Sequence, residues 1–135
     1  MAHATVKWIG SKSFVGIDST NHSVVLSTKE DGVGVKPSEM LLVALAACTS
    51  VDVVDILMKK RQKLTGLEVR ADGEQDPNPP WTYRKIHLHY KLTGKSIRAK
   101  DVEQTIKLSE EKYCSVAATI KGKAEITTDF EIIEG

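Results

Sequence analysis

The sequence predicts an α+β domain in which antiparallel sheets surround one long, buried central helix. Three observations lead to this prediction. A long apolar segment, residues 37–62, is typical of a helix, alternating segments on both sides of it are typical of strands, and turn residues separate these segments. A chain of 135 residues can bury one core but is too short for two ordinary domains, so we expect residues 1–135 to form a single domain.

The N-terminal part of the chain predicts three antiparallel strands. Residues Ala4–Ile9 and Ser13–Ile17 are rich in β-branched and aromatic side chains and are separated by a glycine-containing turn. A third strand, His22–Thr28, follows a cluster of turn residues. Lys29–Lys36 contains two glycines but no GK[ST] pattern follows them, so we interpret it as a flexible connector rather than a phosphate loop.

The central helix is predicted from its apolar composition and from its ends. Every residue of Met40–Ala47 is apolar, and the pattern continues to Met58, so the helix should be apolar on nearly all sides and buried. Pro37 suits the first helical position, Glu39 lies near the positive end of the helix dipole, and basic residues crowd the other end.

The remaining elements follow from alternation and from helical spacing. Leu64–Gln75 and Trp81–Leu92 alternate apolar and polar residues around a proline-rich turn, which predicts a hairpin with one packed face. Ile97–Tyr113 has the spacing of an amphipathic helix with Val102 and Ile106 inward. The last segments are a short helical turn over 115–120, with Ser115 as its cap and Cys114 just outside it, and a strand over 124–133.

Composition excludes several classes of function. The net charge of +1 with interspersed acids and bases offers no basic field for nucleic acid, and the N-terminus has no apolar signal core. The run Met40–Ala47 is much shorter than a membrane span, so we expect a soluble, cytoplasmic protein. His87 and His89 could form a metal pair, but such pairs are more often solvated or cross-strand, and we expect neither a metal nor a cofactor.

The two cysteines, Cys48 and Cys114, are the candidate reactive groups. Cys48 lies about three turns into the helix, too deep for the dipole to lower its pKa, and Asp52 would hinder its ionisation if it faced the thiol. If the two thiols meet, a peroxidatic thiolate could become a sulfenic acid and condense with the second thiol into a disulfide. The alternative is that both cysteines are buried, separate and inert.

Two segments carry a resemblance to a known family. VKPSEMLLVALAACTSVDVV around Cys48 and EEKYCSVAATIK around Cys114 resemble the OsmC/Ohr family of osmotically inducible and organic-hydroperoxide-resistance proteins, in particular its small uncharacterised branch. The resemblance implies an intertwined homodimer and a role in the oxidative stress response. It also implies reduction of organic hydroperoxides or hydrogen peroxide by Cys48 as the peroxidatic thiol and Cys114 as the resolving thiol. An external dithiol, lipoyl-type in some members, would then reduce the disulfide.

The sequence departs from the family pattern at two positions. The family's peroxidases place an arginine upstream of the first cysteine, whereas the first arginine here is Arg61. The family's glutamate after the helix proline falls on Ser38, so Glu39, one residue later, is the candidate third site residue. Other groups that could supply the positive charge are Lys7, Lys12, His22 and Lys36. The missing arginine leaves open a non-enzymatic binder of a small apolar or acyl ligand at the dimer interface, and a redox sensor is a third possibility.

Overall fold

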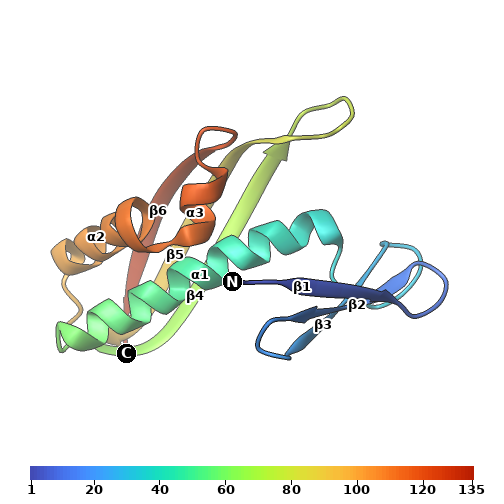
Figure 1. The fold of residues 1–135 in the computed structure, drawn as a ribbon. Coiled ribbons are helices and arrows are strands. Elements are labelled where there is room, and N and C mark those ends of the chain that lie inside the picture. The colour runs from blue at the N-terminus through green and yellow to red at the C-terminus, as the bar shows by residue number, and fades with distance from the viewer. The chain divides into compact units, whose positions relative to one another are not determined.

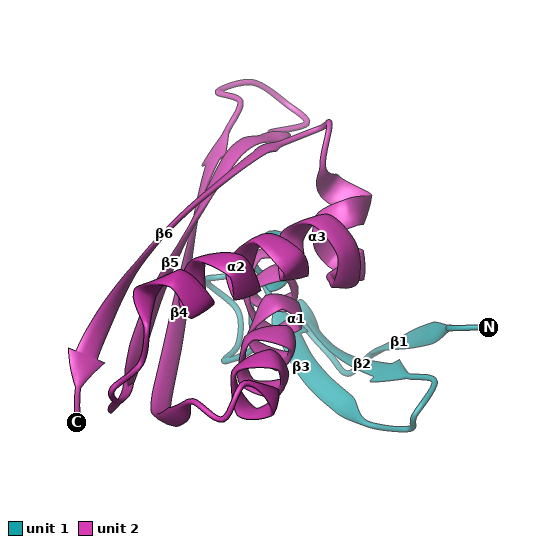
Figure 2. Cartoon of the chain, turned by 90° about the vertical axis from the view of Figure 1, so that its left-hand side faces the viewer, with its two compact units in different colours: residues 1–41 teal, residues 42–135 magenta.

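The computed structural model describes residues 1–135, and it divides into two compact units, Met1–Leu41 and Leu42–Gly135, which Figure 2 shows in separate colours. The order of strands and helices confirms the predicted α+β class (Figure 1). The elements are β1 (Ala4–Trp8), β2 (Ser13–Asp18), β3 (Ser23–Ser27), α1 (Pro37–Lys59), β4 (Lys63–Gln75), β5 (Tyr83–Lys95), α2 (Ala99–Leu108), the π-helical segment η1 (Ser109–Tyr113), α3 (Ser115–Ile120) and β6 (Glu125–Glu134).

The first unit is the predicted three-stranded antiparallel sheet, with strand order β1-β2-β3. The connector after β3 is better ordered than its glycines suggested. Val35 makes a parallel bridge to β3, and a Cβ atom added at Gly34 would lie 2.6 Å from the carbonyl carbon of Leu26. Gly34 is therefore required because the backbone approaches β3 closely.

Helix α1 ends at Lys59, before the predicted end at Gln62. Arg61 has a left-handed backbone conformation with φ of 57°, which stops the helix. The N–H groups of Arg61 and Gln62 donate to the carbonyls of Met58 and Leu57, at 3.0 and 2.9 Å. This arrangement is a Schellman motif, and it satisfies helix-terminal carbonyls without glycine.

In the single chain, α1 is buried on one face only, which corrects the prediction of a helix buried on nearly all sides. The buried residues of the helix within the second unit are Leu45, Thr49, Val53 and Leu57. The opposite face, hereafter the exposed apolar face of α1, consists of Val43, Ala47, Val51, Val54 and Met58. Such a stripe of solvent-facing apolar residues is typical of a surface that another molecule covers.

The length and composition of α1 would also allow it to cross a membrane. Its 18-residue apolar window has a mean hydropathy of 2.1, so the apolar segment is longer than Met40–Ala47 alone. Core helices of soluble proteins pass the same test, and α1 packs one face into a protein core, so this single helix is weak evidence for a membrane span.

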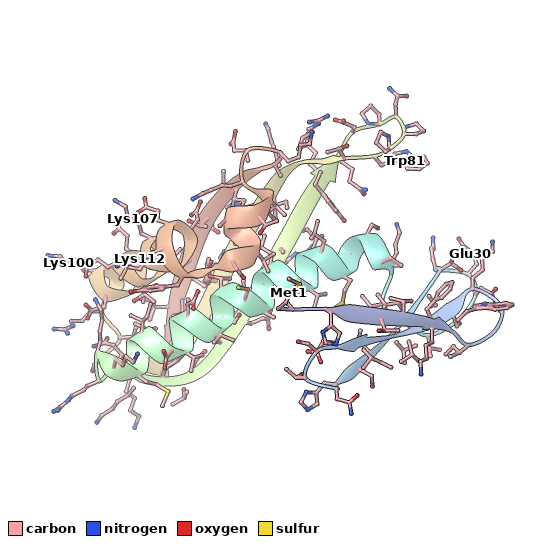
Figure 3. All side chains as sticks on the ribbon, in the orientation of Figure 1. Met1, Glu30, Trp81, Lys100, Lys107 and Lys112 are labelled. Carbon is pink, nitrogen blue, oxygen red and sulfur yellow. The ribbon has the colours of Figure 1, made fainter.

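The second unit contains the sheet β4-β5-β6, which is mixed rather than antiparallel. Strands β4 and β5 form the predicted antiparallel hairpin, with the exposed Trp81 near its tip (Figure 3). Strand β6 pairs with β5 in parallel, from Lys85 with Glu125 to Gly94 with Glu134. The parallel pairing arises because the crossover through α2, η1 and α3 returns the chain to the starting end of β5. β5 also continues to Lys95, past the predicted end at Leu92.

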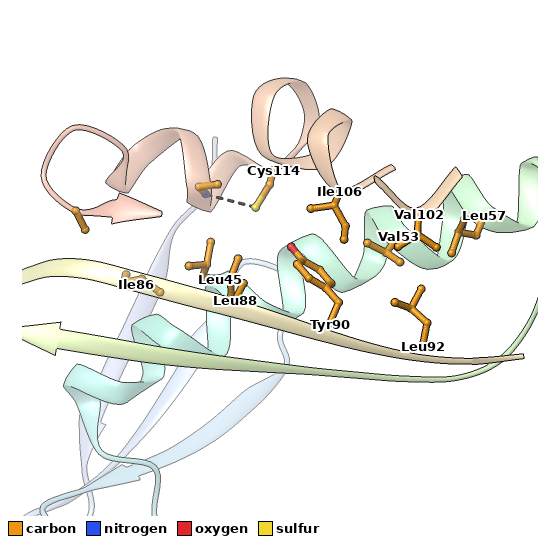
Figure 4. Packing of buried hydrophobic residues seen from close by; sticks show 12 residues of the cluster. Leu45, Val53, Leu57, Ile86, Leu88, Tyr90, Leu92, Val102, Ile106 and Cys114 are labelled. Carbon is orange, nitrogen blue, oxygen red and sulfur yellow. Dashed lines mark hydrogen bonds between the residues drawn. The ribbon is translucent and has the colours of Figure 1, made fainter. Parts of the chain in front are cut away.

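The core of the second unit lies between the sheet and its helices. The apolar face of β5, predicted from alternation, is buried and packs against α1 and α2 (Figure 4). Val102 and Ile106 of α2 are buried as predicted. The predicted helix 97–113 is shorter, because the α-helix ends at Leu108 and a π-helical turn follows. The buried apolar residues are Leu45, Val53, Leu57, Ile86, Leu88, Tyr90, Leu92, Val102, Ile106, Cys114, Ala117 and Ala124.

Candidate functional site

The structure brings the two cysteines together within the second unit. Cys48 lies on α1 and is half-buried, and Cys114 lies between η1 and α3 and is only 2% exposed. The two thiols are both free and are joined by a side-chain hydrogen bond. The fold therefore pairs two cysteines that are far apart in the sequence, and the alternative of two separate cysteines does not describe this structure.

Cys114 is held at its place by backbone geometry on both sides. Its N–H donates to the carbonyl of Ser109 at 2.8 Å, which closes the π-helical turn. Its side chain is the N-cap of α3, because the sulfur accepts a hydrogen bond from the N–H of Ala117 at 3.4 Å (Figure 4). The sequence predicted Ser115 as the cap, and the cap is one residue earlier because the thiol itself receives the free helix N–H.

The surroundings of Cys48 make it the more acidic of the two thiols. Burial opposes its ionisation, but hydrogen bonds from the Cys114 thiol, the Val116 N–H and the Ser115 hydroxyl outweigh this and lower the pKa of Cys48 below the ordinary value. Asp52 acts in the opposite direction, as the sequence predicted. All three donors come from residues 114–116, a short segment that faces α1.

The same surroundings keep Cys114 protonated. Burial and the neighbouring Cys48 sulfur raise the pKa of Cys114 to about 11. The pair therefore ionises at one sulfur, with the Cys114 S–H donating to the Cys48 thiolate. A nucleophilic thiolate beside a protonated thiol can form a sulfenic acid and then a disulfide without a metal or a cofactor.

The other predicted site residues belong to the first unit. Glu39 is exposed in the first turn of α1, and its carboxylate lies 3.9 Å from the ammonium group of Lys36. His22 shares a side-chain hydrogen bond with Thr20 at 2.8 Å. The involvement of Glu39 in the site, and the choice among Lys7, Lys12, His22 and Lys36 as the positive group, remain predictions.

His87 and His89 form a cross-strand ladder with acidic residues of β6. The His89 ring lies 2.8 Å from Asp129 and 2.6 Å from Glu131, and His87 lies 2.7 Å from Asp129 and 2.6 Å from Thr127. These carboxylates raise the pKa of His89. All four ring nitrogens are engaged, and the structure contains no group of three or more histidine, cysteine or acidic residues that could hold a metal ion.

Sequence reasoning missed the donors to Cys48 and a buried chain of hydroxyl groups beside it. Each cysteine is followed by a hydroxyl residue, and the structure gives the two hydroxyls different partners. Ser115 donates to Cys48. Thr49 bonds Tyr90 and Ser109, at 2.8 and 2.9 Å. The repeated Cys-Thr/Ser pattern was a signal for these residues, but it gave no indication of their partners.

Fold and site together define an α+β protein with a two-cysteine thiol site, in which one thiol lies on the central helix and the other caps a short helix beside it. Residues 28–129 match the model of the family described as OsmC-like protein. The chain is 33% identical over 130 residues to protein YhfA of Escherichia coli K12, which covers 96% of this chain and 97% of YhfA. The chain therefore belongs to the OsmC-like family.

Solved structures share the fold. A hypothetical protein from Aquifex aeolicus has a TM-score of 0.90 and 29% identity, and the match covers 100% of this chain and 98% of that one. An organic hydroperoxide resistance protein OsmC from Legionella pneumophila has a TM-score of 0.71 and 14% identity, with 97% and 96% covered. At this lower identity the likeness concerns the fold alone.

Proposed function

We propose that this protein is a thiol-dependent peroxidase that reduces organic hydroperoxides, or hydrogen peroxide, through Cys48 as the peroxidatic thiol and Cys114 as the resolving thiol. The observation that carries the proposal is the pairing of two free thiols in unequal surroundings, Cys48 on α1 and Cys114 at the N-cap of α3. The pKa of Cys48 is lowered and that of Cys114 is raised to about 11, so the nucleophile and the proton donor are already distinguished.

The proposed reaction has two chemical steps. The Cys48 thiolate attacks the terminal oxygen of the hydroperoxide, the O–O bond breaks, and the leaving alkoxide takes a proton to become an alcohol, which leaves Cys48 as a sulfenic acid. The Cys114 sulfur then attacks the Cys48 sulfur. The S–O bond breaks, and the hydroxide leaves with the Cys114 proton as water. An external dithiol, for which a lipoyl-type dithiol is the candidate, would return both sulfurs to thiols.

Two further observations support the proposal. Cys48 packs against the apolar core cluster, and apolar surroundings favour an alkyl hydroperoxide over a small polar one. The OsmC protein of Legionella pneumophila with this fold is named for resistance to organic hydroperoxides. We also propose Glu39 as a third site residue, on the family pattern at the start of the helix.

We propose that the functional unit is a cytoplasmic homodimer with one domain per chain. The exposed apolar face of α1 supports a dimer, because Val51 and Met58 are 68% and 66% exposed in the single chain. A second copy packed on this face would remove a stripe of apolar surface from water.

The test of the peroxidase is a free-thiol titration before and after one equivalent of cumene hydroperoxide. We expect the wild-type protein to lose both thiols, Cys48→Ser to keep its remaining thiol, and Cys114→Ser to accumulate a sulfenic acid that dimedone traps. Survival of both wild-type thiols would refute the peroxidase.

A second function is suggested by a shallow, open apolar depression within the exposed apolar face of α1. It is lined by Ser50, Val51, Val54, Asp55 and Met58. If the thiols do not react, a small apolar or acyl ligand bound at the dimer interface becomes the leading function. Native mass spectrometry would show such a ligand as added mass, and repeated preparations without added mass would count against it.

A further inference from the structure

A chain of buried hydroxyl groups runs from β5 across α1 to the π-helical turn. The Tyr90 hydroxyl points from β5 to α1 (Figure 4) and lies 2.8 Å from Thr49 Oγ1. Thr49 Oγ1 lies 2.9 Å from Ser109 Oγ, which lies 2.7 Å from the carboxylate of Asp52. Tyr90, Thr49 and Ser109 are at most 2% exposed.

The carboxylate at the end of the chain fixes the direction of every hydrogen bond. An ionised carboxylate only accepts, so Ser109 donates to Asp52, and its oxygen accepts from Thr49. Thr49 in turn accepts from Tyr90, which is left as a donor. Each buried hydroxyl is thereby satisfied in a single arrangement, and loss of one member leaves its neighbours unpaired in the core.

Ser109 connects this chain to the resolving cysteine. Its side chain bonds two residues of α1, Thr49 and Asp52, while its carbonyl accepts the N–H of Cys114 at 2.8 Å. Thr49 directly follows Cys48 in the same helix. The turn that ends at Cys114 is therefore hydrogen-bonded to α1 at Thr49, the residue next to Cys48.

We propose that Ser109, together with Thr49, Tyr90 and Asp52, is a positioning residue for the thiol pair and holds Cys114 against Cys48 for disulfide formation. The role of this positioning in catalytic turnover rests on the proposed peroxidase function. The positioning of the two thiols itself can be measured without peroxide. It also explains why an acidic residue lies beside a thiolate. Asp52 disfavours ionisation of Cys48, and it supplies the acceptor that orders the hydroxyl chain.

The experiment measures the effective concentration of the two thiols, from the equilibrium between the reduced protein and its Cys48–Cys114 disulfide in glutathione redox buffers. Thr49→Val keeps the side-chain shape and removes two hydrogen bonds, and Ser109→Ala removes the central link. We expect each to lower the effective concentration roughly tenfold, as the loss of about one hydrogen bond's stabilisation implies. Thr49→Ser, which keeps the hydroxyl, should restore the wild-type value.

The matched control is Thr105→Ala, which removes a hydroxyl that is also fully buried, lies one turn earlier on α2, and bonds the carbonyl of Asp101 at 2.6 Å. We expect it to leave the effective concentration within twofold of wild type. Because the segment 114–116 also supplies the donors that lower the pKa of Cys48, alkylation of Cys48 at pH 7 should be slower in Ser109→Ala than in wild type. After excess peroxide, Ser109→Ala should accumulate more Cys48 sulfinic acid.

Three results would overturn the positioning role: wild-type effective concentrations in both Thr49→Val and Ser109→Ala, an equal decrease in Thr105→Ala, or no recovery in Thr49→Ser. Far-UV circular dichroism would check that each variant is folded, and Thr49→Val decides the question if Ser109→Ala does not fold. If the thiols do not react with peroxide, the proposed peroxidase activity is refuted. The redox-buffer measurement still tests the positioning role independently.

Discussion

Removing the Ser115 hydroxyl should make Cys48 a weaker nucleophile at neutral pH. Ser115 is one of three donors that lower the pKa of Cys48, together with Cys114 and the backbone of Val116. A hydrogen bond to a charged group contributes about 1.5–3 kcal/mol. Because Ser115 is exposed, water replaces part of the lost bond in Ser115→Ala, and about 1 kcal/mol of thiolate stabilisation should be lost.

A loss of about 1 kcal/mol corresponds to a roughly fivefold smaller thiolate fraction below the pKa of Cys48, since about 1.4 kcal/mol is tenfold. The assay is alkylation by iodoacetamide across a pH series, with the modified peptides resolved by mass spectrometry so that Cys48 is followed separately from Cys114. We expect the Ser115→Ala profile to shift to higher pH and its rate at pH 7 to fall about fivefold.

The matched control is Thr119→Ala on the same helix. Thr119 donates to the carbonyl of Ser115 at 2.7 Å, so this variant also loses a side-chain hydrogen bond of α3 but keeps the Ser115 hydroxyl. Its alkylation profile should match that of wild type. An unchanged profile in Ser115→Ala would refute the assignment of Ser115 as a donor, and an equal shift in Thr119→Ala would attribute the effect to helix stability instead.

The remaining predictions concern the fold and its surfaces. The carboxylates of Asp129 and Glu131 raise the pKa of His89, so this imidazolium stabilises the fold below pH about 6.5 and the contribution is lost as pH rises through the folded pKa. Urea unfolding at pH 6 and pH 9 should therefore differ less in His89→Gln than in wild type, and equal differences would contradict this. Met58→Lys should weaken the proposed dimer, which sedimentation velocity would show as a larger monomer fraction at equal concentration. Leu45→Ala, at a fully buried position, should lower the free energy of unfolding by about 2–5 kcal/mol.

Local patterns in the sequence predicted most of the fold. The alternation in β5 identified the buried residues Ile86, Leu88, Tyr90 and Leu92, because one face of a strand packs and the other is solvated. Val102 and Ile106 were identified in the same way from helical spacing. The parallel pairing of β6 could not be predicted, because strand direction depends on where the crossover returns the chain and not on the residues of the strand.

The candidate site was predicted only in its reactive atoms. Cys48 and Cys114 stood out by residue type, but nothing in the sequence indicated that the Cys114 thiol, the Ser115 hydroxyl and the backbone N–H of Val116 would act on Cys48. The sequence directed attention to a missing cation, whereas the stabilisation found in the structure comes from neutral hydrogen-bond donors. The one-sided burial of α1 could not be predicted either, because the sequence of the helix is apolar on both faces.

Activation by neutral donors has a consequence that activation by a cation would lack. A cation beside the pair would favour ionisation of both sulfurs, whereas a single shared proton favours ionisation of one and keeps the other protonated. In the proposed reaction the Cys48 thiolate loses its charge when it becomes a sulfenic acid, so the Cys114 S–H loses the charged acceptor that held it. The residues that stabilise the thiolate, 114–116, include the thiol that attacks next. The same segment, residues 114–116, would thus activate the nucleophile in the first step and supply the resolving thiol in the second. The hydroxyl chain through Ser109 would keep this segment in place during both steps.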